Sequence, residues 1–146
     1  MATDSCQRLF SLKAFKGKGE IARQIEVARA RLATVWEDMA ALTESSKQMP
    51  GHSFYLFLHR YTDQKGELGI TLRWRMTGGK HATWEVIRPI VGQLPVQMQQ
   101  WYREANVIAL YLNMQDKTVR TEIRNLEQLL KDLVSLAQSM PADTQG

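Results

Sequence analysis

Residues 53–76, SFYLFLHRYTDQKGELGITLRWRM, decide the fold of this chain. The first part of this stretch is rich in aromatic and aliphatic residues, and the last part alternates between apolar and polar residues. The apolar face of that alternation consists of Leu68, Ile70, Leu72, Trp74 and Met76. Period-two alternation and aromatic enrichment are typical of half-buried strands. The stretch therefore predicts two antiparallel strands joined by the polar segment DQKGE.

Gly66 sets the register that we expect for this hairpin. A type I turn over residues 64–65, closed by Gly66 in the left-handed conformation, makes a three-residue loop with a bulge. Phe57 then faces Arg73 across the two strands. A four-residue loop would slip the pairing by one residue and reverse the faces of the first strand.

Apolar residues spaced alternately by four and three positions predict helices on both sides of the hairpin. We expect one helix over residues 21–42, a second from Pro95 to Leu112 and a third from Thr118 to Ala137, with a break at 113–117. A turn at residues 77–80 leads into a third strand at about 81–87. The order α-β-β-β-α-α predicts an α+β fold, a three-stranded antiparallel meander covered by helices on its apolar face.

The 146 residues predict a single domain, 1–146, with a loose arm at 1–12 and a flexible tail at 139–146. Hydrophobic residues make up 44% and charged residues 23%, which excludes a disordered chain. No apolar run approaches the roughly 18 residues of a membrane span, and no secretory leader is evident. Because Cys6 is the single cysteine, no internal disulfide can form, and we expect a cytoplasmic protein without membrane contact.

We expect neither an enzyme nor a bound cofactor or metal. The three histidines, His52, His59 and His81, share no ligand-like spacing with one another or with Cys6. No nucleophile motif is present. The run 78–80, GGK, lacks the flanking pattern of a phosphate-binding loop.

The charge distribution favours a nucleic-acid partner. The net charge is +4, and seven basic against three acidic residues place the whole excess in residues 1–36. The first candidate contact is the lysine segment before the first helix, Lys13, Lys16 and Lys18, where free backbone N–H groups and the helix dipole favour a phosphate. An ordinary flexible loop is the alternative interpretation.

The sheet face opposite the core is the second candidate, with Lys80 in the following turn. In the expected register, aromatic rings alternate there with arginines: Tyr55, Phe57, His59 and Tyr61 beside Thr71, Arg73 and Arg75. Such a face can stack unpaired bases, at roughly 1–3 kcal/mol per base. The alternative is that a helix or a second subunit covers it.

The third candidate is a basic stripe on the last helix, formed by Lys117, Arg120, Arg124 and Lys131 and interrupted by Glu127. A solvated helix face with pairs three and four residues apart is the alternative interpretation.

Six short sequence motifs follow one another along the chain: 69–75 GITLRWR, 81–85 HATWE, 94–95 LP, 101–102 WY, 112–113 LN and 120–124 RTEIR. Over about residues 10–135 this succession resembles the small proteins of proteobacterial integrative and conjugative elements, some of them named integrase regulator R. The resemblance implies a cytoplasmic bacterial protein tied to the maintenance, excision or transfer of a mobile element. It supplies no established active site.

The leading hypothesis is a non-enzymatic accessory protein of a mobile element that binds DNA, single strands in preference to duplex. The alternative is a homodimeric adaptor or regulator that contacts a recombinase, repressor or replication protein. An inhibitor of a host enzyme is a third option, which the basic pI near 9.4 disfavours in its acidic, nucleic-acid-mimicking form. The directions of the Tyr55, Phe57, Arg73 and Arg75 side chains discriminate between the first two.

Overall fold

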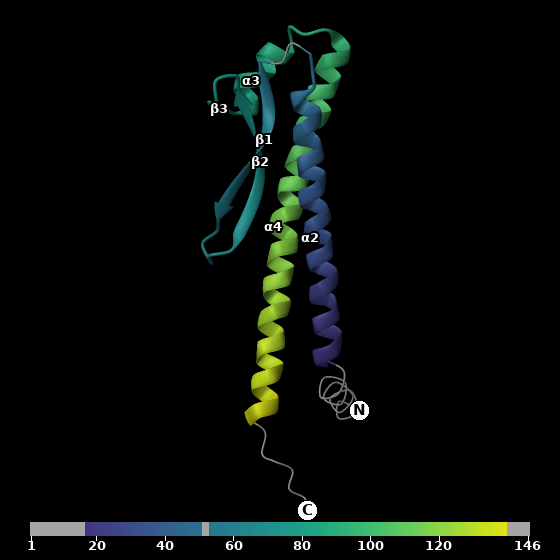
Figure 1. The fold of residues 1–146 in the computed structure, drawn as a ribbon, viewed down its shortest axis with the longest axis vertical. Coiled ribbons are helices and arrows are strands. Elements are labelled where there is room, and N and C mark those ends of the chain that lie inside the picture. The colour runs from purple at the N-terminus through teal and green to yellow at the C-terminus, as the bar shows by residue number, and fades with distance from the viewer. Residues whose placement is uncertain (1–16, 51–52, 140–146) are drawn as a thin grey trace, which may run out of the picture. The chain divides into compact units, whose positions relative to one another are not determined.

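The computed structural model describes residues 17–50 and 53–139 (Figure 1). Its elements follow the expected order and confirm the α+β class: α2 (Gly17–Lys47), β1 (Phe54–Thr62), β2 (Leu68–Met76), β3 (His81–Ala82), α3 (Trp84–Val91) and α4 (Val96–Ser139). The strands form one antiparallel sheet in the order β1-β2-β3. The expected arm at 1–12 lies outside the described residues, as does the expected tail beyond Ser139, the last residue of α4.

The chain divides into two compact units. We call residues 32–120 the sheet unit; its counterpart, the two-helix unit, has residues 17–31 and 121–139 as its described part. Each of the long helices, α2 and α4, contributes to both units. Each unit is described by itself below.

The hairpin register is confirmed residue by residue. Phe57 pairs with Arg73, and the turn closes through an N–H···O bond of 2.9 Å from Asp63 to Glu67. Gly66 has φ 82°, the left-handed conformation that the three-residue loop requires. The side-chain oxygen Oδ1 of Asp63 also accepts the backbone N–H groups of Lys65 and Glu67 at 2.9 and 3.0 Å, which fixes the loop locally.

The expected third strand at 81–87 is wrong beyond its first two residues. The strand β3 covers only His81–Ala82, and the chain then turns into α3, Trp84–Val91. Ile87 and Val91, four residues apart, are both fully buried in this helix. Their helical spacing outweighs the strand preference of the β-branched residues in the segment.

The expected break at 113–117 is also wrong, because α4 is a single helix of 44 residues. Asn113 and Asp116 are polar residues that often end helices, since their side chains compete for nearby backbone groups. Here both side chains bind partners in other elements instead: Asn113 reaches the backbone of Leu72, and Asp116 accepts the indole N–H of Trp36 at 2.7 Å. The helix therefore continues through them.

The core of the sheet unit lies on the even-numbered face of the hairpin. Buried sheet residues include Phe54, Leu56, Ile70, Leu72 and Trp74. They pack in one cluster with residues of all three helices, Val35, Met39, Ile87, Val91, Tyr102, Ala105, Ala109 and Leu112. The helices of the unit consequently cover one face of the hairpin and leave its odd-numbered face free (Figure 1).

Helix side chains satisfy backbone groups at both outer edges of the hairpin. On the β1 edge, the backbone N–H of Leu56 donates to Oγ of Ser46 at 2.9 Å. On the β2 edge, the amide of Asn113 accepts from the N–H of Leu72 at 2.7 Å and donates to its C=O at 3.1 Å. Asn113 thus makes the two hydrogen bonds that a neighbouring strand would make with Leu72, a position that β3 does not reach.

The two-helix unit pairs the N-terminal half of α2 with the C-terminal part of α4. Ile25, Ala28 and Ile123 are buried there, and Leu130 is half-buried. Ion pairs link the two helices: Arg31 with Glu122 at 2.8 Å and Arg29 with Glu127 at 3.8 Å. No described helix has the length and apolar character needed to cross a membrane.

We predict that Asn113→Ala destabilises the protein by roughly 1–3 kcal/mol, because the buried backbone N–H and C=O of Leu72 lose their partner. The measurement is urea unfolding. Asn125→Ala, at an exposed position of the same helix, is the matched control and should change stability little. Equal effects of the two substitutions would contradict the edge-closing role.

Candidate functional site

A row of rings occupies the free, odd-numbered face of the hairpin, as the sequence predicts. Phe57 and His59 have ring centroids 6.1 Å apart, and His59 stacks on Tyr61 at 6.3 Å and 11°. Tyr55 lies on the same face of β1, two residues before Phe57. Their side chains are half-buried. Neighbouring rings contact one another along the row, and Arg120 of α4 contacts the Tyr61 ring at its end.

Two arginines of β2 lie beside this row. The guanidinium of Arg75 stands 3.6 Å from the centre of the Phe57 ring, a close cation–π contact. Arg73, the pairing partner of Phe57, is exposed. Arg75 therefore presents a flat cation on top of the ring, and Arg73 offers an accessible positive charge next to it.

His81 joins the same cluster from β3. Its ring centroid lies 5.4 Å from that of Phe57 and 6.1 Å from that of His59. From the sequence, His81 is a histidine without ligand-like spacing at the start of the expected third strand, and its place beside the rings is not predicted. The signal that could have found it is the turn at 77–80, which returns the chain to pair His81 with Arg75.

Burial, followed by the charges of Arg73, His81 and Arg75, lowers the pKa of His59. The lowered pKa favours the neutral imidazole, which can stack as an uncharged ring. A phosphate placed among these cations would favour the protonated form and oppose the shift.

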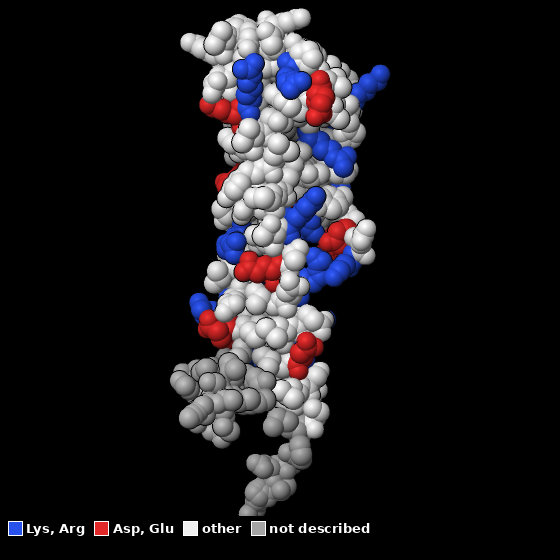
Figure 2. Space-filling view, turned by 180° about the vertical axis from the view of Figure 1, so that it is seen from behind, with Lys and Arg blue, Asp and Glu red and all other residues white. Residues whose placement is uncertain are grey.

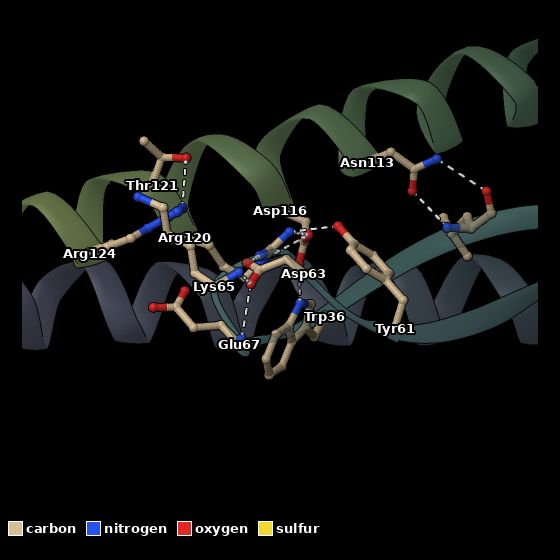
Figure 3. A network of polar contacts seen from close by, with 11 residues as sticks. Trp36, Tyr61, Asp63, Lys65, Glu67, Asn113, Asp116, Arg120, Thr121 and Arg124 are labelled. Carbon is tan, nitrogen blue, oxygen red and sulfur yellow. Dashed lines mark hydrogen bonds and ion pairs between the residues drawn. The ribbon is translucent and has the colours of Figure 1, made fainter.

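Arg120 is not available to a nucleic acid, which corrects the expectation from the sequence. Its side chain is 7% exposed and forms ion pairs with Asp63 at 2.6 Å and Asp116 at 3.0 Å (Figure 3). It also donates to the hydroxyl of Tyr61 at 2.6 Å. Burial disfavours the charged guanidinium, yet the bonds to these partners outweigh that cost and raise the pKa of Arg120. Arg120 is a structural residue.

Tyr61 belongs to both the ring row and this buried network. Gly69, its pairing partner on β2, has no side chain, and the Tyr61 ring fills the space: a Cβ atom there would stand 2.5 Å from the ring. The same Cβ would stand 2.8 Å from the guanidinium of Arg120. Gly69 therefore allows Tyr61 to cross β2 and reach Arg120.

The remaining predicted basic residues do not form one surface with the rings. Lys13 and Lys16 lie outside the described residues. Lys18 is exposed in the two-helix unit, where Arg124 is half-buried and donates to Thr121 at 3.4 Å. Lys80 and Lys117 are exposed in the sheet unit, and Lys80 lies directly before His81.

Acidic side chains lie among the basic ones on the face drawn in Figure 2, so that face carries no continuous basic patch. In the two-helix unit, Arg29 and Arg31 form ion pairs with Glu127 and Glu122. Glu127, which interrupts the expected basic stripe, is one of the acids involved. The ring row with Arg73 and Arg75 is therefore the best candidate site on the described chain.

Within residues 17–50 and 53–139, no three metal-ligating side chains come together. No protein-family model matches this chain, and neither curated proteins nor solved structures gave a significant match.

We predict that Gly69→Ala displaces Tyr61 and Arg120 and destabilises the protein by about 1–3 kcal/mol, as overpacking does. Gly19→Ala is the matched control: its Cβ would meet nothing within 4 Å, and alanine favours the helix. Thermal unfolding compares the two variants. Similar melting temperatures for both would contradict the crossing of Tyr61 over Gly69.

A second prediction concerns acid stability. Backbone N–H bonds from Glu67 and Lys65, together with Arg120, lower the pKa of Asp63. The folded state thus favours the ionised carboxylate, and the stability this supplies is present above the ordinary aspartate pKa of 3.8 and is lost as pH falls below it.

Asp63→Asn should therefore be less stable than the wild type at pH 7, and its stability should fall less steeply in acid. Denaturant unfolding across that pH range measures both effects. Asp38→Asn, at an exposed position of α2, serves as the control. A wild-type slope in Asp63→Asn would contradict the assignment.

Proposed function

We propose that this chain binds nucleic acid on the odd-numbered face of its hairpin, with single strands preferred to duplex. The observation that carries the proposal is the row Phe57, His59 and Tyr61, with His81 beside it and Arg73 and Arg75 at its side. The core cluster of the sheet unit packs on the opposite face, and among the described helices only the Arg120 side chain of α4 is found against a ring of the row, that of Tyr61.

The ring row suits unpaired bases because every base offers a flat face for stacking. The Arg75 guanidinium on Phe57 adds a second planar surface, since arginine planes also stack on bases. The exposed guanidinium of Arg73 supplies a charge for the phosphates between stacked bases. Along β1 and β2, the arrangement thus combines rings that can stack on bases with a charge that can neutralise the phosphates of the nucleic acid.

Duplex recognition fits the described helices less well. Readers of double-stranded DNA usually insert a helix into the major groove. Within α4 the basic stripe loses Arg120 to a buried ion pair, and Glu127 pairs with Arg29. No uninterrupted basic helix face remains among the residues that the stripe was predicted from.

The proposed setting is the cytoplasm of a bacterium, with the protein acting as a non-enzymatic accessory factor of a mobile element. This part of the proposal rests on the resemblance of the scattered strings in the sequence and on the single cysteine. The hairpin string 69–75 contributes both Arg73 and Arg75, so the resembling residues include part of the proposed site.

A second candidate function, a homodimeric or heteromeric adaptor, is favoured by a different observation. A stripe of apolar residues on α4 is exposed by 53–64%: Val107, Leu110, Tyr111 and Met114. Their spacing of three and four places them on one side of the helix. Exposed apolar patches of this kind are typical of protein contacts.

Phe57→Ala should weaken binding to a single-stranded oligonucleotide by roughly 1–3 kcal/mol and affect duplex binding less. Its melting temperature should stay close to that of the wild type, because Phe57 lies outside the core cluster. Fluorescence anisotropy at low salt measures both affinities. If wild-type protein binds no oligonucleotide under these conditions, the adaptor function is the better proposal.

The double variant Arg73→Ala/Arg75→Ala should flatten the salt dependence of binding. Each lost phosphate contact lowers the slope of log affinity against log salt by roughly 0.7–0.9. Arg88→Ala/Arg103→Ala, which removes two exposed arginines of α3 and α4, provides the matched charge control. Equal slopes in the double variant and the control would remove the β2 arginines from the site.

A further inference from the structure

A cleft of about 520 Å³ opens in the sheet unit beside the end of β3. Its apolar lining includes Leu72, Trp74, Trp84 and Leu110. Polar residues also line it: Asn106, Asn113, Arg73, His81 and Glu85. This volume lies within the range of roughly 300–1,000 Å³ that is usual for sites of small organic groups.

The cleft exists because β3 stops after two residues. On the N-terminal side of Trp74, the outer edge of β2 has no described strand beside it, and the chain leaves this edge to begin α3 at Trp84. Asn113 already occupies both backbone groups of Leu72 at that edge. An extended peptide therefore cannot add to β2 there, which argues against a strand-like occupant.

The cleft is continuous with the proposed nucleic-acid surface. Arg73 and His81 line the cleft, and both also belong to the group around the ring row. A nucleic-acid strand lying on the rings would therefore reach the cleft after passing these two side chains. The positive charge of Arg73 matches a phosphate at the point where that strand would turn over the sheet edge.

The chemistry of the lining suits a nucleobase. The indoles of Trp74 and Trp84 lie 5.9 Å apart between centroids, tilted by 34°, and offer an aromatic wall. Oδ1 of Asn106 accepts the indole N–H of Trp74 at 2.9 Å. That bond orients the amide, and its NH₂ group has no acceptor among the described residues, so it can donate to a base carbonyl or ring nitrogen.

We propose that one unpaired base of the bound strand turns over the edge of the sheet and inserts into this cleft, against Trp84 and within reach of Asn106. The inference rests on the proposed single-strand binding and adds to it a site for a single base. Glu85, the one acid in the lining, can accept a hydrogen bond from an exocyclic amino group of the base.

The test uses a set of single-stranded oligonucleotides, each with 2-aminopurine or an abasic residue at one position. With the full-length wild-type protein, one position should show a distinct fluorescence change. Removal of the base at that position should weaken binding roughly 5- to 150-fold, the equivalent of one stacked base. Abasic residues that weaken binding equally at every position would overturn the proposal.

Trp84→Ala should weaken binding to the intact strand and make the abasic residue at that position harmless, as expected for two groups that contact each other. Trp101→Ala, outside the cleft lining, is the control. Leu110→Glu provides a second, independent variant, because Leu110 is 61% exposed and the substitution should not disturb folding. It places a negative charge at the cleft and should weaken binding.

Val107→Glu is the matched control for Leu110→Glu: Val107 is 64% exposed on the same stripe of α4 but is not part of the cleft lining. Equal binding by these two variants, with an unchanged abasic profile, would overturn the base site. If Phe57→Ala still weakens binding in that case, the proposed function stands without the cleft. Absence of oligonucleotide binding by wild-type protein would overturn both.

Discussion

The sheet unit depends on the ion pairs and hydrogen bonds of the buried Arg120 guanidinium. A charge that is only 7% exposed is tolerated where its desolvation is offset by good partners, and here two carboxylates and a phenol supply them. Each partner fixes a different part of the unit. Asp63 holds the hairpin loop, Tyr61 holds the end of β1, and Asp116 extends the network to Trp36 of α2 (Figure 3). The strand pair is therefore attached to both long helices by one directional network in addition to the apolar core.

Edge closure by Ser46 and Asn113 complements this network. A sheet with one two-residue strand leaves backbone groups open on both sides, and such edges invite pairing with other chains. The helix side chains occupy these groups at two buried core residues, Leu56 and Leu72. Helical packing and strand pairing are thereby linked at defined points, which explains why polar residues within the long helices do not interrupt them.

The features that the sequence predicted correctly depend on local rules. Gly66 and the alternation of residues 68–76 determined the hairpin register, and the register determined which side chains share a face with the rings. The missed features depend on distant partners. Arg120 looked like part of a solvated stripe because Asp63 lies 57 positions earlier in the chain. Asn113 looked like a helix break because its true partner, Leu72, is 41 positions away. The cleft could not be foreseen either, since it follows from the early end of β3.

The proposed site combines a ring that the buried network holds in place with an arginine that is exposed to solvent. At one end of the ring row, the hydroxyl of Tyr61 is fixed by Arg120, and its ring stacks on His59. A side chain that is already ordered loses little conformational entropy when a base stacks on it, so the buried network contributes to binding without touching the ligand. Beside Phe57, the Arg73 side chain is exposed to solvent and carries a charge that a phosphate can reach. An ordered stacking row beside an accessible charge suits a flexible single strand, because base stacking then sets the position of the nucleic acid and the charge neutralises its backbone.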